Sequence, residues 1–183
     1  FLSTHFLYRE RTKEHKINIS SYKHSDIDDI IMQNCIDEMS SNKRNTHSVK
    51  VLYENFIQKD PLKTFSKFTA QNVIDFFDYI KITETQKIVL QGICYFIQLI
   101  PYNEQFQELV LRLDFYSNIK RLIEPPIKDD VQELALWCVV YSLDLNMDFR
   151  KCLFDNEIYD TLINYNENYY ETGTSYSEYI RGK

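Results

Sequence analysis

Glycine is scarce in this chain of 183 residues, where only Gly92, Gly173 and Gly182 occur. A dinucleotide-binding loop or a P-loop needs several glycines close together, because its backbone amides must approach the phosphates. Three scattered glycines exclude both kinds of loop, so we expect no nucleotide cofactor held in that way. Proline is nearly as rare, with four residues, and so few helix breakers favour a helical chain.

Basic residues are in the minority. The chain has 21 Lys and Arg against 27 Asp and Glu, which gives a formal net charge of -6. Nucleic acids and anionic membranes attract clustered Lys and Arg, so the acidic balance argues against both as the main partner. The densest apolar run, residues 88–100, is interrupted by two glutamines and a glycine. It falls short of the roughly 18 apolar residues of a membrane span. We expect neither a nucleic-acid nor a membrane partner.

The cysteines lack the CxxC spacing of zinc and redox motifs. Three of them lie in otherwise apolar helical patterns, which favours buried, reduced thiols. Residues 1–22 contain no small-residue cleavage site after an apolar stretch, as a secretory signal would. These features predict an intracellular protein of the cytoplasm or nucleus. The four cysteines are Cys35, Cys94, Cys138 and Cys152.

No set of residues has the spacing of a catalytic or metal site. All four histidines lie within the first 47 residues, and no pair has the helical spacing beside Cys or carboxylate that zinc needs. Cys94 and Cys138 fall in the most apolar helical patterns, where a thiol is inert. Carboxylate pairs such as Asp75 and Asp78 are explained as helix caps or solvated faces. We expect no cofactor, no metal and no catalysis; a helical enzyme with an unrecognised site is the alternative.

Apolar residues recur three and four positions apart along most of the chain, as in amphipathic helices, and strand patterns are nearly absent. The fold class is therefore predicted to be all-α. Thr69 is expected to cap one helix, and Thr83 with Gln86 to form a capping box for another. The first helix is predicted to bury Ile27, Ile30, Ile31, Cys35 and Met39. Helices are predicted over residues 27–39, 46–60, 70–80, 84–100, 106–113, 115–123, 131–145, 149–154 and 156–165.

The two most apolar helices repeat each other. Residues 86–99 (QKIVLQGICYFIQL) align with residues 132–145 (QELALWCVVYSLDL), with four identical positions. Two shorter helices follow each segment with matching apolar residues, and residues 30–33 match residues 88–91 more weakly. A period of about 40 to 47 residues is the signature of HEAT or armadillo arrays.

The succession of a short, a medium and a long buried helix over residues 106–146 resembles the armadillo repeat in particular. In residues 131–137 (VQELALW), Ala135 and Trp137 stand where that family's third helix typically carries Ala and Trp. The Asn that the family has four residues after the Trp is replaced by Tyr141. The resemblance implies a short right-handed α-solenoid over residues 25–165. Residues 1–24 would be an N-terminal extension, and residues 166–183 a polar, Tyr-rich acidic tail.

The resemblance also implies a binding face. On each long helix, residues four apart share one side, and in an armadillo-like stack that side lines the concave groove. The alternative is that Trp137 and the two tyrosines, Tyr95 and Tyr141, simply pack between repeats. The predicted partner-binding residues are Lys87, Gln91, Tyr95, Glu133, Trp137 and Tyr141.

The predicted function is a non-catalytic protein-interaction module or scaffold segment. A narrower alternative is a regulatory domain of a larger protein that resembles the armadillo regions docking small GTPases. Acidic residues outnumber basic ones by 11 to 4 over residues 129–183. This end is either a solvated surface or a dock for a protein partner with a basic segment.

Overall fold

The computed structural model of the chain describes residues 26–42, 44–124 and 129–162. All regular structure in these ranges is helical and no strand occurs in them, which confirms the all-α prediction for this part of the chain. Within the same ranges, none of the helices combines the length and apolar character that crossing a membrane requires. The predicted extension, residues 1–24, and tail, residues 166–183, lie outside the described residues.

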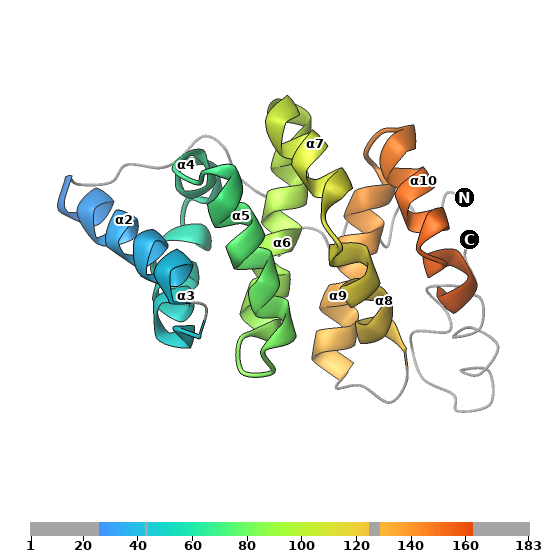
Figure 1. Ribbon diagram of the computed structural model, residues 1–183, viewed down its shortest axis with the longest axis horizontal. Helices are drawn as coiled ribbons and strands as arrows, with labels where there is room; N and C mark the ends of the chain where they lie inside the picture. The colour runs from blue at the N-terminus through green and yellow to red at the C-terminus, as the bar shows by residue number, and fades with distance from the viewer. Residues whose placement is uncertain (1–25, 43, 125–128, 163–183) are drawn as a thin grey trace.

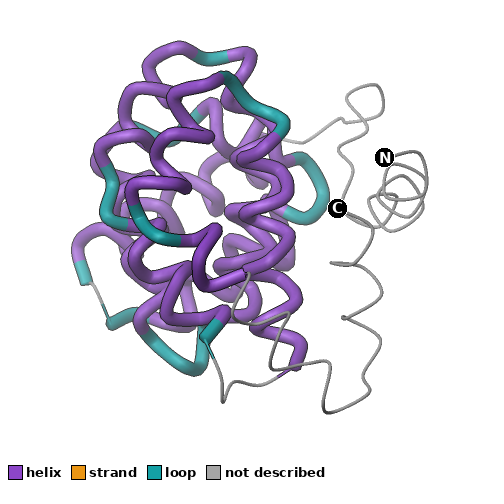
Figure 2. Tube along the Cα trace, turned by 90° about the vertical axis from the view of Figure 1, so that its right-hand side faces the viewer, coloured by secondary structure: helices purple, strands orange, loops and turns teal. Residues whose placement is uncertain are grey.

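Along the long axis of the molecule the helices run from α2 at one end to α10 at the other, with α8 and α9 beside each other (Figure 1). Figure 2, turned by a right angle, shows that helices make up nearly all of the described trace and that the loops lie at its edges. A last helical turn covers residues 158–162. The elements are α2 (Asp26–Ser41), α3 (Thr46–Leu52), η1 (Tyr53–Ile57), α4 (Pro61–Ser66), α5 (Ala70–Asp78), η2 (Tyr79–Lys81), α6 (Gln86–Leu99), η3 (Ile100–Tyr102), α7 (Glu104–Arg112), α8 (Phe115–Ile123), α9 (Asp129–Leu143) and α10 (Met147–Asp155).

η1 continues α3 as a π-helical turn. The amide of Gln58 donates to the carbonyl of Tyr53, five residues earlier, at 2.9 Å. A π turn holds one residue more than the α-helical path would. The chain then ends this helix before Asp60, as predicted. Asp60 caps α4, a short helix that the sequence interpretation missed, by accepting from the Lys63 amide at 3.0 Å.

Two predicted helix starts have different outcomes. Thr69 and Asn72 form a reciprocal capping box at α5, which confirms that start. The box predicted for Thr83 and Gln86 is wrong, because Thr85 is the N-cap of α6 and makes no side-chain cap bond. The buried Thr85 hydroxyl donates instead to the Tyr79 carbonyl at 2.9 Å. The Thr85 side chain therefore binds η2 and does not cap α6.

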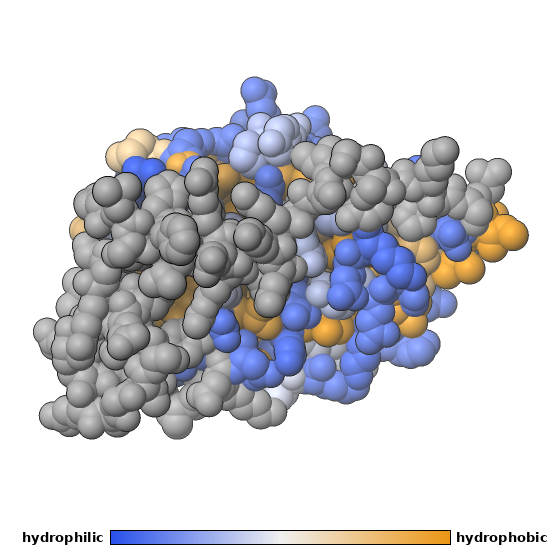
Figure 3. Space-filling model, turned by 180° about the vertical axis from the view of Figure 1, so that it is seen from behind, coloured by the Kyte–Doolittle hydropathy of each residue, from blue (hydrophilic) through white to orange (hydrophobic). Residues whose placement is uncertain are grey.

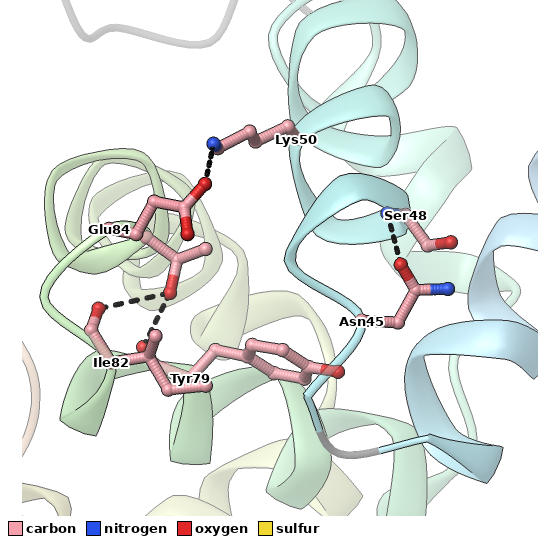
Figure 4. Close-up of polar contacts among 7 residues, drawn as sticks. Asn45, Ser48, Lys50, Tyr79, Ile82 and Glu84 are labelled. Carbon is pink, nitrogen blue, oxygen red and sulfur yellow. Dashed lines mark hydrogen bonds and ion pairs between the residues drawn. The ribbon is translucent and has the colours of Figure 1, made fainter.

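The loop between α2 and α3 is held at both ends (Figure 4). The Tyr79 hydroxyl donates to the carbonyl of Asn42 at 2.7 Å, and burial raises the pKa of this phenol. Asn45 caps α3 by accepting from the Ser48 amide at 3.1 Å. Lys50 and Glu84 point toward each other and form an ion pair. These contacts fasten α3 to the segment that precedes α6.

The buried face of α2 differs from the prediction. Ile27, Ile30 and Ile31 were expected in the core, but they are 69%, 63% and 44% exposed. Among the described elements α2 stands at one end of the molecule and packs on α3 and α5 from one side only (Figure 1). The weaker sequence match of residues 30–33 with residues 88–91 stays a prediction. The side that α2 buries consists of Met32, Cys35, Ile36 and Met39.

Aromatic rings fill the core where α4, α5 and α6 meet. Phe65 packs edge-on against Phe96, with ring centroids 5.0 Å apart. Phe77 lies between Phe96 and Phe115 of α8, at 5.4 and 5.3 Å. Each such pair stabilises the fold by about 0.5–1.5 kcal/mol beyond the area it buries. The rings thus connect α4 to α8 through one continuous core.

Gly92, in the middle of α6, is required by close packing. A Cβ at this position would lie 2.6 Å from Cζ of Phe76 and 2.9 Å from its Cε1. Phe76 is fully buried and cannot swing away, since its ring is held by Phe65 and Phe68 at 6.1 and 6.0 Å.

We predict that Gly92→Ala destabilises the protein by about 1–3 kcal/mol, the usual cost of overpacking. This loss comes despite the roughly 1 kcal/mol by which Ala is the better helix former. Urea unfolding followed by circular dichroism measures it. Adding Phe76→Leu to Gly92→Ala should recover part of the loss, and a Gly92→Ala protein more stable than wild type would contradict this packing.

Candidate protein-binding face

The two helices of the predicted repeat, α6 and α9, pack directly against each other. Cys94 Sγ and Cys138 Sγ lie 3.5 Å apart across this contact. Each thiol also reaches the backbone of the opposite helix, Cys94 at 3.8 Å from the Leu134 carbonyl and Cys138 at 3.7 Å from that of Leu90. Small side chains at the crossing allow this close approach. The contact fixes how the two predicted binding rows lie relative to each other.

An ion pair joins the first turns of the same two helices. Lys87 Nζ lies 2.9 Å from Asp130 Oδ2, and both side chains are about half exposed, at 55% and 54%. The hydrogen bond from Lys87 lowers the pKa of the Asp130 carboxyl. An exposed pair of this kind contributes little to stability. Lys87 is therefore placed by the pair and still open to solvent.

The three rings of the predicted face are buried. Trp137 is 5% exposed, Tyr141 4% and Tyr95 8%. The rings of Trp137 and Tyr141 are in contact, with centroids 5.8 Å apart. Burial is the main cause that raises the pKa of Tyr53 in η1, and the nearby Tyr95 raises the pKa of Tyr53 further. These rings contribute packing between helices, as the alternative interpretation expects.

The six predicted residues thus divide by accessibility. Lys87 is exposed, Gln91 and Glu133 are half-buried, and the three rings are buried. α6 packs on α9, and the contacts of the predicted residues are the ion pair of Lys87 with Asp130, which crosses this junction, and the ring contact of Trp137 with Tyr141, which lies within α9. The surface that a partner could touch is polar. The role of all six residues in binding stays a prediction.

Several buried polar residues escaped the sequence interpretation. Asp75 was assigned to a cap or a solvated face, but it is 2% exposed and accepts from Gln71 Nε2 at 2.9 Å. The signal in the sequence that could have indicated its burial is its position two residues after Val73 and next to Phe76, both of which are buried. Such interior hydrogen bonds satisfy polar groups that would otherwise destabilise the core.

A buried hydrogen-bond chain links α8 to α9. The Tyr116 hydroxyl donates to Ser142 Oγ at 3.0 Å, and Ser142 donates to the Cys138 carbonyl at 2.7 Å. Burial raises the pKa of Tyr116, so the phenol stays protonated. Gln132 adds a second link by donating to the Ile123 carbonyl at 3.0 Å. These bonds hold α9 against α8.

The possible metal ligands and the cysteine thiols of the described residues were compared with the needs of a metal site and of a nucleophile. No three His, Cys, Asp or Glu side chains in the described ranges lie together as a metal site would require. The cysteines carry free thiols, three buried and one, Cys152, half-buried. Burial raises the pKa of Cys138 and of Cys152, which lowers the thiolate fraction that a nucleophile needs.

Comparison with known proteins adds no relative: no family model, no curated protein and no solved structure matches the chain. The resemblance to armadillo repeats therefore depends on the repeated sequence and on the order of the helices.

The environments of the thiols predict their reactivity. In the native protein at pH 8, we expect an aromatic disulfide reagent to label Cys152 first and to leave Cys94 and Cys138 unlabelled until the protein unfolds. Mass spectrometry of the labelled peptides in water and in urea measures this order. Labelling of Cys138 as fast as Cys152 would show that α6 and α9 are not packed as described.

Proposed function

We propose that the helices form a short right-handed armadillo-like α-solenoid and that the protein is a non-catalytic protein-interaction module or scaffold segment. The observation that carries the proposal is a repeated order of helices. α4, α5 and α6 have 6, 9 and 14 residues, and α7, α8 and α9 have 9, 9 and 15. The two long helices lie side by side, and so do α7 and α10, which begin successive units. Neighbour-to-neighbour packing of this kind is typical of repeat proteins.

The proposed binding face is the row of polar groups over the junction of α6 and α9. Lys87 and Glu133 supply opposite charges, and Gln91 supplies both a donor and an acceptor that can pair with a peptide amide. Trp137 and Tyr141 are buried, so the polar groups are the part of the proposed face that a partner can reach.

The proposed partner is a protein, and a basic segment would suit it. Residues 129–162 contain eight acidic and two basic side chains, and Asp144, Asp148, Asp155 and Asp160 are exposed. A field of one sign accelerates the approach of an oppositely charged partner more than it tightens the complex. Free thiols throughout the described helices support a reducing compartment, the cytoplasm or nucleus, as the place of binding.

A photo-crosslinking residue tests the binding face. With p-benzoylphenylalanine in place of Gln91, we expect illumination of the source cells to give one discrete protein adduct, because this side chain lies at the junction of the two long helices. The matched control replaces Glu108 of α7, whose side chain is 75% exposed. Identical adducts from both positions, or none from position 91, would contradict binding at this face.

The burial of Trp137 predicts a large effect on stability. Trp137→Ala should lower the free energy of unfolding by about 3–5 kcal/mol, the range for a large buried ring. Lys87→Ala should lower it by less than about 1 kcal/mol, because its ion pair is exposed. Urea unfolding of the two variants compares these losses. If Trp137→Ala proves as mild as Lys87→Ala, the ring contributes little packing and belongs to an open groove.

A further inference from the structure

α2 carries an apolar surface on the side opposite its buried face. Ile27, Ile30 and Ile31 are spaced at i, i+3 and i+4, so they adjoin one another on the helix. They are among the most exposed large apolar side chains of the described residues, at 69%, 63% and 44%. Hydrophobic atoms accordingly appear at the edge of the molecule that α2 forms, on the right in Figure 3. This is the end of the row of helices, where α2 has described neighbours on one side only.

The same side of the helix becomes acidic farther along. Glu38 follows Ile27 by eleven residues, about three turns, and Asp37 follows Ile30 by seven, about two turns, so both return to this side, and both are exposed. Asp37 accepts from Gln33 Nε2 at 2.9 Å, and Glu38 accepts from Ser48 Oγ at 2.5 Å. Ser48 is a buried residue of α3, so the Glu38 carboxylate lies at the edge of this side that is next to α3. We name the surface of Ile27, Ile30, Ile31, Asp37 and Glu38 the α2 outer face.

No basic side chain offsets this charge on α2 itself, whose sequence is DIDDIIMQNCIDEMSS. Lys63 of α4 reaches the helix, but its ammonium pairs with Asp29 at 2.5 Å. That pair brings α4 next to the N-terminal half of α2. Leu62, beside Lys63, is itself 42% exposed. On the α2 outer face the isoleucines thus precede the two exposed carboxylates, while Asp28 and Asp29 of the first half are half-buried.

We propose that the α2 outer face binds an amphipathic helix of a partner protein, one with an apolar patch followed by Lys or Arg. Apolar side chains at i, i+3 and i+4 of the partner cover the isoleucines, as in helix-in-groove and coiled-coil recognition. Its basic residues meet Asp37 and Glu38. From Ile30 to Asp37 is seven residues, about 10 Å along the axis, so the basic residues lie about two turns from the apolar patch.

A second copy of this chain does not meet these requirements. Parallel pairing of α2 with α2 places acid against acid, and in no orientation does α2 supply a basic partner for Asp37 and Glu38, because the helix has no Lys or Arg. Like charges in an interface destabilise it. The charge pattern therefore selects a basic helix. This site is separate from the face proposed over α6 and α9, so either proposal can fail without the other.

A synthetic helical peptide tests the proposal with the full chain. The probe carries Leu at i, i+3 and i+4 and Arg ten and eleven residues after the first Leu, the spacing of Asp37 and Glu38 from Ile27. Fluorescence anisotropy measures its binding. A matched peptide has Glu in place of Arg. We expect saturable binding of the Arg peptide, and binding at least about tenfold weaker for the Glu peptide or for the Ile30→Glu protein. Met147→Glu is the control variant, because Met147 is also an exposed apolar residue, 71%, but lies on α10.

Charge reversal separates specific binding from general stickiness. A protein with Asp37→Lys and Glu38→Lys should prefer the Glu peptide over the Arg peptide. Absence of saturable binding, or equal binding by the wild-type, Ile30→Glu and Met147→Glu proteins, would overturn the proposal. So would self-association in sedimentation that Ile30→Glu abolishes, because the occupant would then be a second copy. Ile30 is exposed, so Ile30→Glu should keep the wild-type circular dichroism; Ile27→Ser serves if it does not.

Discussion

The packing of α6 on α9 is the contact on which the described fold depends. α6 packs against η1, α4 and α5, and α9 packs against α8 and α10, so their contact joins the two halves of the molecule, together with the rings of Phe77 and Phe115. Cys94 and Cys138 lie at the crossing with their sulfur atoms 3.5 Å apart. Larger side chains there would push the helices apart, because packed interiors have little free volume. The spacing of the proposed binding rows is therefore set by two small, uncharged thiols.

Much of the helical organisation could be predicted from the sequence, because apolar spacing and caps are local. The start of α5 at Thr69 and the position of α9 follow from such signals. The prediction failed where the outcome depends on distant partners. Ile27 and Ile30 fit a helical stripe as well as Met32 does, and only the position of α3 and α5 decides which side of α2 is buried. Thr85 likewise donates its hydroxyl to a carbonyl of η2 and does not cap its own helix.

The candidate site could be predicted only in part. Spacing alone placed Gln91 with Tyr95 and Trp137 with Tyr141 on shared sides of their helices, and the self-similarity of the two helices identified α6 and α9, which the structure packs together. The burial of the three rings could not be predicted. The same local sequence allows a ring on a central helix to face either a groove or a neighbouring helix. The structure separates the members by exposure, leaving a polar surface over buried rings.

The π turn of η1 has a consequence for how the chain can change in length. The bond from Gln58 to Tyr53 spans five residues where an α-helix spans four, so this segment holds one residue more than its path needs. Loss of one residue here would restore α-helical winding while α4 stayed in place. Residues 53–57 are thus the point inside the helical core at which a deletion can be absorbed locally, whereas a deletion within α6 would rotate Gly92 away from Phe76.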